Sequence, residues 1–270
     1  MNFSALISVY AKEDPSYLEL SLSSLENQTL MPSEIVIVKD GSLTPELDLV
    51  ISDCRKESDI PYKIVNIVHN IGLGRALNHG IKYCSYEWIA RMDSDDIAVS
   101  DRFEKQIEYL EKYKNVSVLG GSICEFDQDF WECTKERKTP QRHKDILRYS
   151  KYRNPINHMT VMFKKEDALS VGGYLPLEGF EDYYLWIRML QYRFVFANLD
   201  DVLVKVRAGD SMLKRRRGWG YMRNEWLFEK SARREGFLTR YEMYRNIFIR
   251  TVARLMPSFI FKRVYRSLRR

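Results

Sequence analysis

Short apolar runs rich in β-branched residues alternate with helix-like patterns through the first two-thirds of the chain, and this alternation limits the fold more than any other feature. The runs cover residues 4–10, 34–39, 62–68 and 88–92. Between the first two, Leu18, Leu22 and Leu25 recur at the spacing of one helix face. Such alternation predicts an α/β protein whose parallel sheet is covered by helices.

The later elements are less regular. Further helices are expected at 45–56, 74–84, 100–113 and 183–191, and further strands at 116–126, 159–163, 194–198 and 202–207. Asp14 and Ser100 stand where helix N-caps are expected. Because ligands bind beyond the carboxyl ends of strands in such sheets, polar residues that follow the strands are the first candidates for a site.

The charge of the chain is unevenly distributed. The total is +6, yet residues 212–270 hold 17 lysines and arginines against four acidic residues, which leaves the first 211 residues at −7. An acidic body and a basic tail indicate two different roles. We expect a main domain at 1–211, with halves at 1–100 and 101–211, followed by a basic helical extension at 212–270.

Membrane spans and secretion are not expected. No apolar run approaches the roughly 20 residues that cross a bilayer, and the first residues carry no basic region or long apolar segment typical of a secretory signal. The four cysteines form no CxxC pair, which favours buried, reduced thiols of a cytosolic protein over a disulfide or a zinc site. These cysteines are Cys54, Cys84, Cys124 and Cys133.

Three carboxylates lie within four positions directly after the fourth strand, as Asp93-Ser94-Asp95-Asp96. Such a concentration of negative charge is costly unless a cation offsets it. A divalent ion held by one or two carboxylates and by substrate phosphates would do so. An acidic turn that caps the next helix is the alternative, and the position at a strand end favours the metal.

Two further turns follow strands. Asp40-Gly41 ends the second strand and could accept hydrogen bonds from a nucleoside, or could be a plain turn. Residues 70–78 follow the third strand, and their glycines would let an anion approach the N-terminus of a helix. A GxG pattern also suits any helix entry, so each turn alone is weak evidence.

Six motifs occur together in one order: LISVY, IVIVKDG, NIGLGRALNHG, ARMDSDD, GGY and GFEDYYLWIRM. In this combination the chain resembles glycosyltransferase family 2 over residues 3–210. The resemblance implies a GT-A fold with a mixed sheet flanked by helices. It also implies a nucleotide-diphosphate-sugar donor, a divalent metal, and inversion at the anomeric carbon.

The resemblance implies that residues 1–211 are a catalytic domain, with a nucleotide-sugar half at 1–100 and an acceptor half at 101–211, and it implies a role for each motif. The nucleotide would be bound by Val9 and Tyr10 against the base, Asp40 on uracil, Gly72, Arg75, and Asp93 on the ribose. Asp95 would hold Mn²⁺ or Mg²⁺, with Asp96 beside it. Asp182 matches the catalytic base and Glu181 adjoins it, although a helix N-terminus is often acidic for purely structural reasons.

The motifs leave two further candidates for the acceptor or the diphosphate. His158 could contact either one, but a lone histidine is more often structural. Arg215, Arg216 and Arg217 could fold over the diphosphate, where guanidinium groups suit phosphate oxygens. They depart from the QxxRW pattern of processive synthases, and a solvated basic turn is the alternative.

The last residues suggest a surface role. Phe248, Val252, Leu255 and Phe259 recur at helical spacing among arginines that include Arg250, and Pro257 divides this stretch into two short helices. Basic amphipathic helices of this kind lie on anionic membranes. A partner helix or a homo-oligomer contact is the alternative, and no recognised module indicates nucleic acid.

The resemblance therefore implies an inverting, metal-dependent hexosyltransferase. By the same resemblance, it would transfer glucose or galactose from a UDP-sugar to a polyprenyl-diphosphate-linked saccharide in bacterial O-antigen or lipopolysaccharide synthesis. It would act in the cytoplasm, on the inner face of the inner membrane. A metal-dependent nucleotidyltransferase and a non-catalytic sugar-nucleotide-binding protein are the alternatives.

Overall fold

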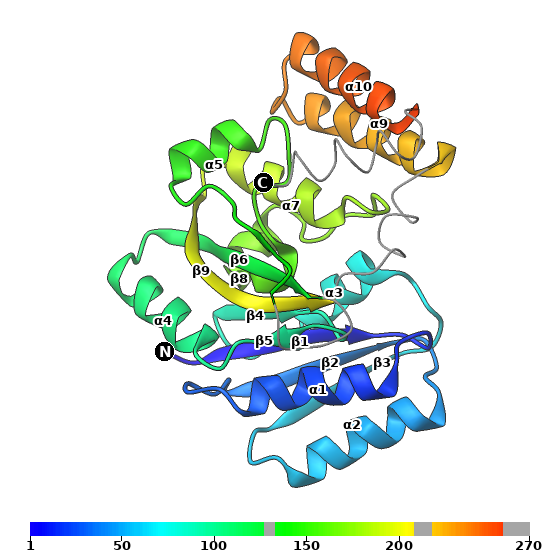
Figure 1. The fold of residues 1–270 in the computed structure, drawn as a ribbon, viewed down its shortest axis with the longest axis vertical. Coiled ribbons are helices and arrows are strands. Elements are labelled where there is room, and N and C mark those ends of the chain that lie inside the picture. Colours follow the sequence, from blue (N-terminus) through cyan, green and yellow to red (C-terminus); the bar gives the residue numbers. More distant parts are fainter. Residues whose placement is uncertain (127–132, 208–217, 256–270) are drawn as a thin grey trace.

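One mixed sheet runs through the computed structural model, which describes residues 1–126, 133–207 and 218–255 (Figure 1). Its strands are β1 (Phe3–Val9), β2 (Glu34–Asp40), β3 (Tyr62–Ile67), β4 (Trp88–Met92), β5 (Ile97–Ala98), β6 (Val116–Phe126), β7 (Lys135–Arg137), β8 (Met162–Lys164) and β9 (Val195–Arg207). They lie in the order β3-β2-β1-β4-β8-β6-β9-β5, with β7 beside β6. The first four strands in this order, β3, β2, β1 and β4, run parallel to one another, and β8 is antiparallel to both of its neighbours.

Helices cover both faces of this sheet and divide the core in two. One core layer includes α1 (Pro15–Glu26), α2 (Pro45–Glu57) and α4 (Arg102–Lys112), and the other includes α3 (Leu73–Ile81), α5 (His143–Tyr149), α6 (Lys165–Ser170) and α7 (Glu181–Gln191). The predicted cap of α1 is confirmed, because Asp14 accepts a hydrogen bond from the Ser16 backbone N–H at 2.9 Å. The leucines predicted for its inner face are fully buried.

The predicted parallel strands agree with the structure to within one residue at each end. The second half differs more. The two closing strands expected at 194–198 and 202–207 form one long β9, because the 11-residue β6 offers it a template that continues past register shifts. The strand expected at 159–163 starts instead with a 3₁₀ turn, η1 (His158–Thr160), and Asp101 rather than Ser100 is the N-cap of α4.

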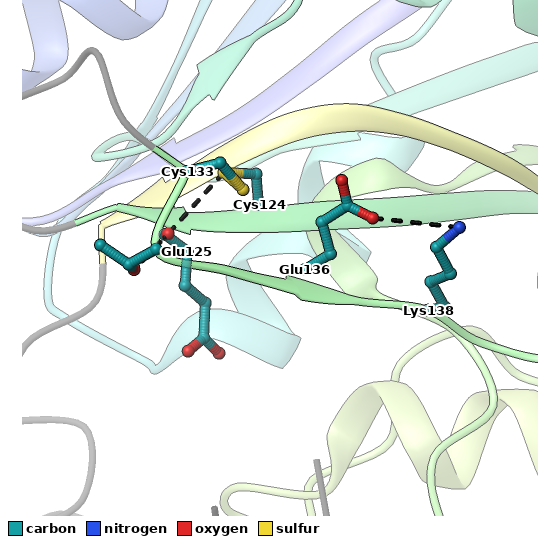
Figure 2. The surroundings of a disulfide bond; sticks show 6 residues. Cys124, Glu125, Cys133, Glu136 and Lys138 are labelled. Carbon is teal, nitrogen blue, oxygen red and sulfur yellow. Dashed lines mark hydrogen bonds and ion pairs between the residues drawn. A yellow bond between two sulfur atoms is a disulfide. The ribbon is translucent and has the colours of Figure 1, made fainter. Parts of the chain in front are cut away.

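The expectation that all four cysteines are reduced is wrong for two of them. Cys124, near the end of β6, and Cys133, just before β7, form a disulfide with their Cα atoms 5.6 Å apart (Figure 2). The two cysteines are nine residues apart, and their spacing alone does not predict a bond. They meet because β7 folds back antiparallel on β6. Cys54 and Cys84 are free thiols, as expected.

A hairpin of two helices, α9 (Trp219–Arg234) and α10 (Arg240–Leu255), packs beside α7 at one end of the molecule (Figure 1). Phe228 of α9 belongs to the same core layer as α7 and stacks on Tyr183 at a ring-centroid distance of 4.4 Å. The helical part of the predicted extension is therefore confirmed for residues 218–255, while Pro257 and Phe259 lie outside the described residues.

The hairpin also corrects one prediction about the tail. Arg250 was expected among the basic residues available to an anionic membrane, but it pairs with the buried Glu225 at 3.0 Å and with Glu229 at 3.4 Å. By contrast, Phe248 is 69% exposed. Within the three described ranges, no helix is both long and apolar enough to cross a membrane.

Candidate active site

A cleft of about 720 Å³ opens at the carboxyl ends of β1, β2 and β4, where the parallel topology predicts a ligand site. Six of the predicted site residues line it: Tyr10, Asp40, Gly72, Asp93, Asp95 and Asp96. They lie at or after the ends of four strands, β1 to β4, which the fold brings together around one cavity. Val9 is fully buried, and Arg75 is exposed on α3.

Asp40, the last residue of β2, organises the loop in front of α3. Its two carboxylate oxygens accept hydrogen bonds from the backbone N–H groups of Ile71, at 2.7 Å, and Gly72, at 3.0 Å. Gly72 has φ +88°, a conformation that favours glycine, and it is the N-cap of α3. The aspartate therefore fixes the predicted glycine turn, and a nucleobase would have to share its oxygens.

The Asp93-Ser94-Asp95-Asp96 segment leaves β4 directly into the cleft, as predicted. Asp93 forms an ion pair with Arg91, whose side chain is 1% exposed. The Ser21 hydroxyl of α1 donates to the backbone oxygen of Asp93 at 2.9 Å, so the turn is anchored from both core layers. Arg91 thus supplies a protein cation beneath the acidic cluster, which sequence reasoning missed.

The other two carboxylates remain in an unfavourable electrostatic setting. Burial, together with the neighbouring charge of Asp93, raises the pKa of Asp95. Asp96 is 2% exposed, and burial with the charges of Asp93 and Asp95 raises its pKa well above the ordinary value. The raised pKa values of both carboxylates indicate that a bound cation would stabilise their ionised forms.

A divalent metal fits this cluster only if the substrate shares in its coordination. Within the part of the chain that the structure describes, no three His, Cys, Asp or Glu side chains are grouped to hold a metal ion. Asp95 reaches the cleft, whereas the Asp93 carboxylate is paired with Arg91 and Asp96 accepts from the Arg207 backbone N–H at 3.2 Å. One or two carboxylates plus diphosphate oxygens form an ordinary Mg²⁺ or Mn²⁺ ligand set.

Arg207, at the end of β9, also lines the cleft and was not predicted. Its guanidinium lies 3.4 Å from the centre of the Tyr17 ring, a cation–π contact that joins β9 to α1. The only sequence signal was a basic residue at a strand end. Its significance depends on the pairing of β9 with β6, which local patterns do not show.

The predicted base lies at the N-terminus of α7, beside the N-terminus of α3. A Cβ added to Gly74 of α3 would lie 2.7 Å from the Glu181 Cγ, so the two helix starts are in close contact. Asp182 accepts a hydrogen bond from the Asn154 side-chain amide at 2.6 Å. Burial and the charge of Asp182 raise the pKa of Glu181.

The GGY motif packs against the same helices. Asn78 of α3 accepts a hydrogen bond from the Tyr174 backbone N–H at 3.1 Å, and a side chain at Gly173, whose φ is +63°, would collide with it. Arg188 of α7 donates to the Gly173 carbonyl at 2.6 Å. The motif therefore joins α3 to α7.

His158 belongs to this packed region and does not line the cleft. Its Nε2 lies 2.7 Å from the Tyr174 hydroxyl, and burial, with the charge of Arg91, lowers its pKa well below the ordinary value. These contacts account for the residue structurally, and its acceptor role stays a prediction. The predicted Arg215, Arg216 and Arg217 lie outside the described residues.

Comparison with solved structures defines the class of this fold. The mannosyltransferase PcManGT of Pyrobaculum calidifontis, solved with GDP-Man and Mn²⁺, superposes with a TM-score of 0.65 at 17% identity. The superposition covers 92% of this chain and 68% of that chain. The sheet and its flanking helices form a GT-A fold, as predicted.

Sequence comparison identifies the family. The family model described as glycosyl transferase family 2 matches residues 4–169. The chain is 41% identical to the amylovoran biosynthesis glycosyltransferase AmsE of Erwinia amylovora, over 99% of both chains. It is 35% identical, over 98% of its length and 96% of the other, to an Escherichia coli UDP-Gal:alpha-D-GlcNAc-diphosphoundecaprenol beta-1,3-galactosyltransferase. The chain belongs to glycosyl transferase family 2, which confirms the resemblance of its motifs.

Proposed function

We propose that this glycosyltransferase moves glucose or galactose, with inversion, from a UDP-sugar to a lipid-diphosphate-linked saccharide used in bacterial surface polysaccharide. The observation that carries the proposal is the strand-end cleft that joins Asp40, Asp93 and Asp95. The Escherichia coli relative, whose name gives UDP-Gal and GlcNAc-diphosphoundecaprenol, supports the donor and the acceptor class. The Erwinia relative, named for amylovoran biosynthesis, supports a role in polysaccharide synthesis.

The transfer is a single displacement. The acceptor hydroxyl oxygen bonds to the anomeric carbon, the bond from that carbon to the diphosphate oxygen breaks, and UDP leaves with the electron pair. The hydroxyl proton passes to Asp182, which acts as the general base on the face opposite the leaving group. The carboxylate of Glu181 beside Asp182 adds negative charge, which favours transfer of the proton to Asp182.

The acidic turn would bind the diphosphate end of the donor. Asp95, with Asp96 behind it, would hold Mn²⁺ or Mg²⁺ there, and the ion would offset the charge that grows on the departing diphosphate. Asp93 would bind the ribose, and its ion pair with Arg91 would fix its orientation there. The raised pKa values of Asp95 and Asp96 support a cation at this point.

The outer face of α10 would bring the enzyme to its lipid-linked acceptor. Tyr241, Tyr244, Phe248 and Val252 follow one side of the helix and are 75%, 66%, 69% and 40% exposed. Aromatic residues suit the boundary between headgroups and acyl chains. We expect peripheral binding to the cytoplasmic leaflet, with basic residues of the same region attracted to anionic lipid.

A donor panel tests this function. UDP-glucose, UDP-galactose, UDP-GlcNAc and UDP-GalNAc are each offered with a synthetic lipid-diphosphate GlcNAc acceptor and Mn²⁺, and products are read by mass spectrometry and NMR. The proposal requires release of UDP and a lengthened acceptor with inverted configuration. Release of inorganic diphosphate would instead indicate a nucleotidyltransferase, and binding without turnover of any sugar would indicate a non-catalytic protein.

A further inference from the structure

Asn154 stands between a tight turn and the predicted base. Its side-chain nitrogen donates to the Asp182 Oδ2 at 2.6 Å, while its side-chain oxygen accepts from the Ile156 backbone N–H at 3.2 Å. The second contact fixes which end of the amide faces Asp182. A donor that is oriented in this way holds a carboxylate oxygen in one place and favours its ionised form.

The backbone that precedes Asn154 is held from two sides. Tyr183, the neighbour of Asp182 on α7, donates its hydroxyl to the Ser150 carbonyl at 2.7 Å. From α10, Asn246 donates to the Lys151 carbonyl at 2.8 Å and Arg250 donates to the Tyr152 carbonyl at 2.7 Å. The turn at 150–154 is therefore fixed by consecutive anchors, which lets Asn154 act as a rigid donor.

We infer that Asn154 is a positioning residue for the base Asp182 and that α10 braces the turn that presents it. This inference rests on the proposed function, because it assumes that Asp182 takes the acceptor proton. Asn154 itself contacts no reacting atom. It holds the Asp182 Oδ2 and so fixes the orientation in which the carboxylate meets the acceptor hydroxyl.

The pH dependence of transfer distinguishes this role from a purely structural one. Glu181, on the same helix, and Tyr174, on the preceding loop, are ionisable groups whose charges act together with Asp182. Both residues are still present when Asn154 is replaced, so a shift of the profile reports the lost contact to Asp182. Loss of the amide donor makes protonation of Asp182 easier, so the acid limb of the kcat profile should move to higher pH.

Two substitutions separate the two hydrogen bonds of Asn154. Asn154→Asp keeps an acceptor for the Ile156 N–H but replaces the donor with a second carboxylate, whereas Asn154→Ala removes both contacts. A hydrogen bond to a charged group stabilises the ionised carboxylate by an amount equivalent to about one to two pH units, so the acid limb should shift by that much in both variants. We expect kcat at neutral pH to fall about tenfold or more. Asn66→Asp, on the exposed side of β3, is the matched charge control.

The assay follows UDP release from whichever donor of the panel is turned over, between pH 5 and 9, with UDP affinity measured by calorimetry. The inference predicts shifted profiles with unchanged UDP affinity for both Asn154 variants and a normal profile for the control. A normal Asn154→Asp profile would overturn it and leave Asn154 a structural residue. Full activity of Asp182→Asn would instead overturn the proposed function, whatever the Asn154 variants do.

Discussion

Arg250 anchors α10 to two buried carboxylates, and its replacement should destabilise the whole protein. In Arg250→Met the side chain keeps much of its length but loses the ion pairs to Glu225 and Glu229, which are 2% and 0% exposed. Breaking a buried ion pair by removing one partner costs about 3–5 kcal/mol. For a chain of this size, that loss corresponds to a melting temperature lowered by roughly 10 °C.

The loss should also depend on pH in a definite direction. Burial raises the pKa of Glu229, and the charge of Arg250 acts against that rise, so the variant should raise it further. A carboxyl with a raised pKa in the folded state binds more protons there than in the unfolded chain. Stability therefore falls as the pH rises from the ordinary carboxyl range through the raised pKa, and the deficit should be larger at pH 8 than at pH 5.

Urea unfolding monitored by tryptophan fluorescence at both pH values measures this effect. Arg223→Met, an exposed arginine on α9, is the matched control and should unfold as the native protein does. Adding Glu225→Gln and Glu229→Gln to Arg250→Met should recover most of the stability, because no buried charge is then left unpaired. Equal stability of Arg250→Met and the native protein, or the same deficit at both pH values, would refute this account of the hairpin.

Three further outcomes are expected for the proposed reaction. EDTA should abolish transfer, and Asp95→Ala should cripple it without unfolding by circular dichroism, because the carboxylate that would hold the ion is lost; full activity in EDTA would contradict the assignment. Asp182→Asn should lower kcat by about 10²–10⁴-fold while UDP affinity by calorimetry stays unchanged, since only the proton acceptor is removed. The double variant Tyr244→Ser, Phe248→Ser should bind anionic vesicles at least about tenfold more weakly in co-sedimentation, because apolar area is lost from the outer face of α10. Tyr192→Ser, at an equally exposed tyrosine outside α10, should bind as the native protein does, and equal sedimentation of the native protein and both variants would argue against docking by α10.

The nucleotide half of the fold could be predicted because its signals are local. Each parallel strand is a short apolar run bounded by polar or glycine-containing turns, and β4 agrees with its expected bounds, Trp88–Met92. The acidic turn lies in the cleft because it directly follows β4. In the second half the deciding interactions are distant: β9 is one strand only because β6 lies beside it, and Cys133 meets Cys124 only because β7 folds back.

The arrangement of the candidate base depends on contacts of the same distant kind. The Glu181-Asp182 motif could be matched from the sequence, but its placement beside the donor cleft depends on α3, since Gly74 leaves room for Glu181. Asn78 and Tyr174, 96 residues apart, complete that contact. The glycine turn that ends in α3 therefore has two functions, because its first residues shape the nucleotide cleft and the helix that follows sets where α7 begins. Residues that orient rather than react, such as Asn154, leave no pattern beyond an Asn-Pro pair, so only the fold could assign them.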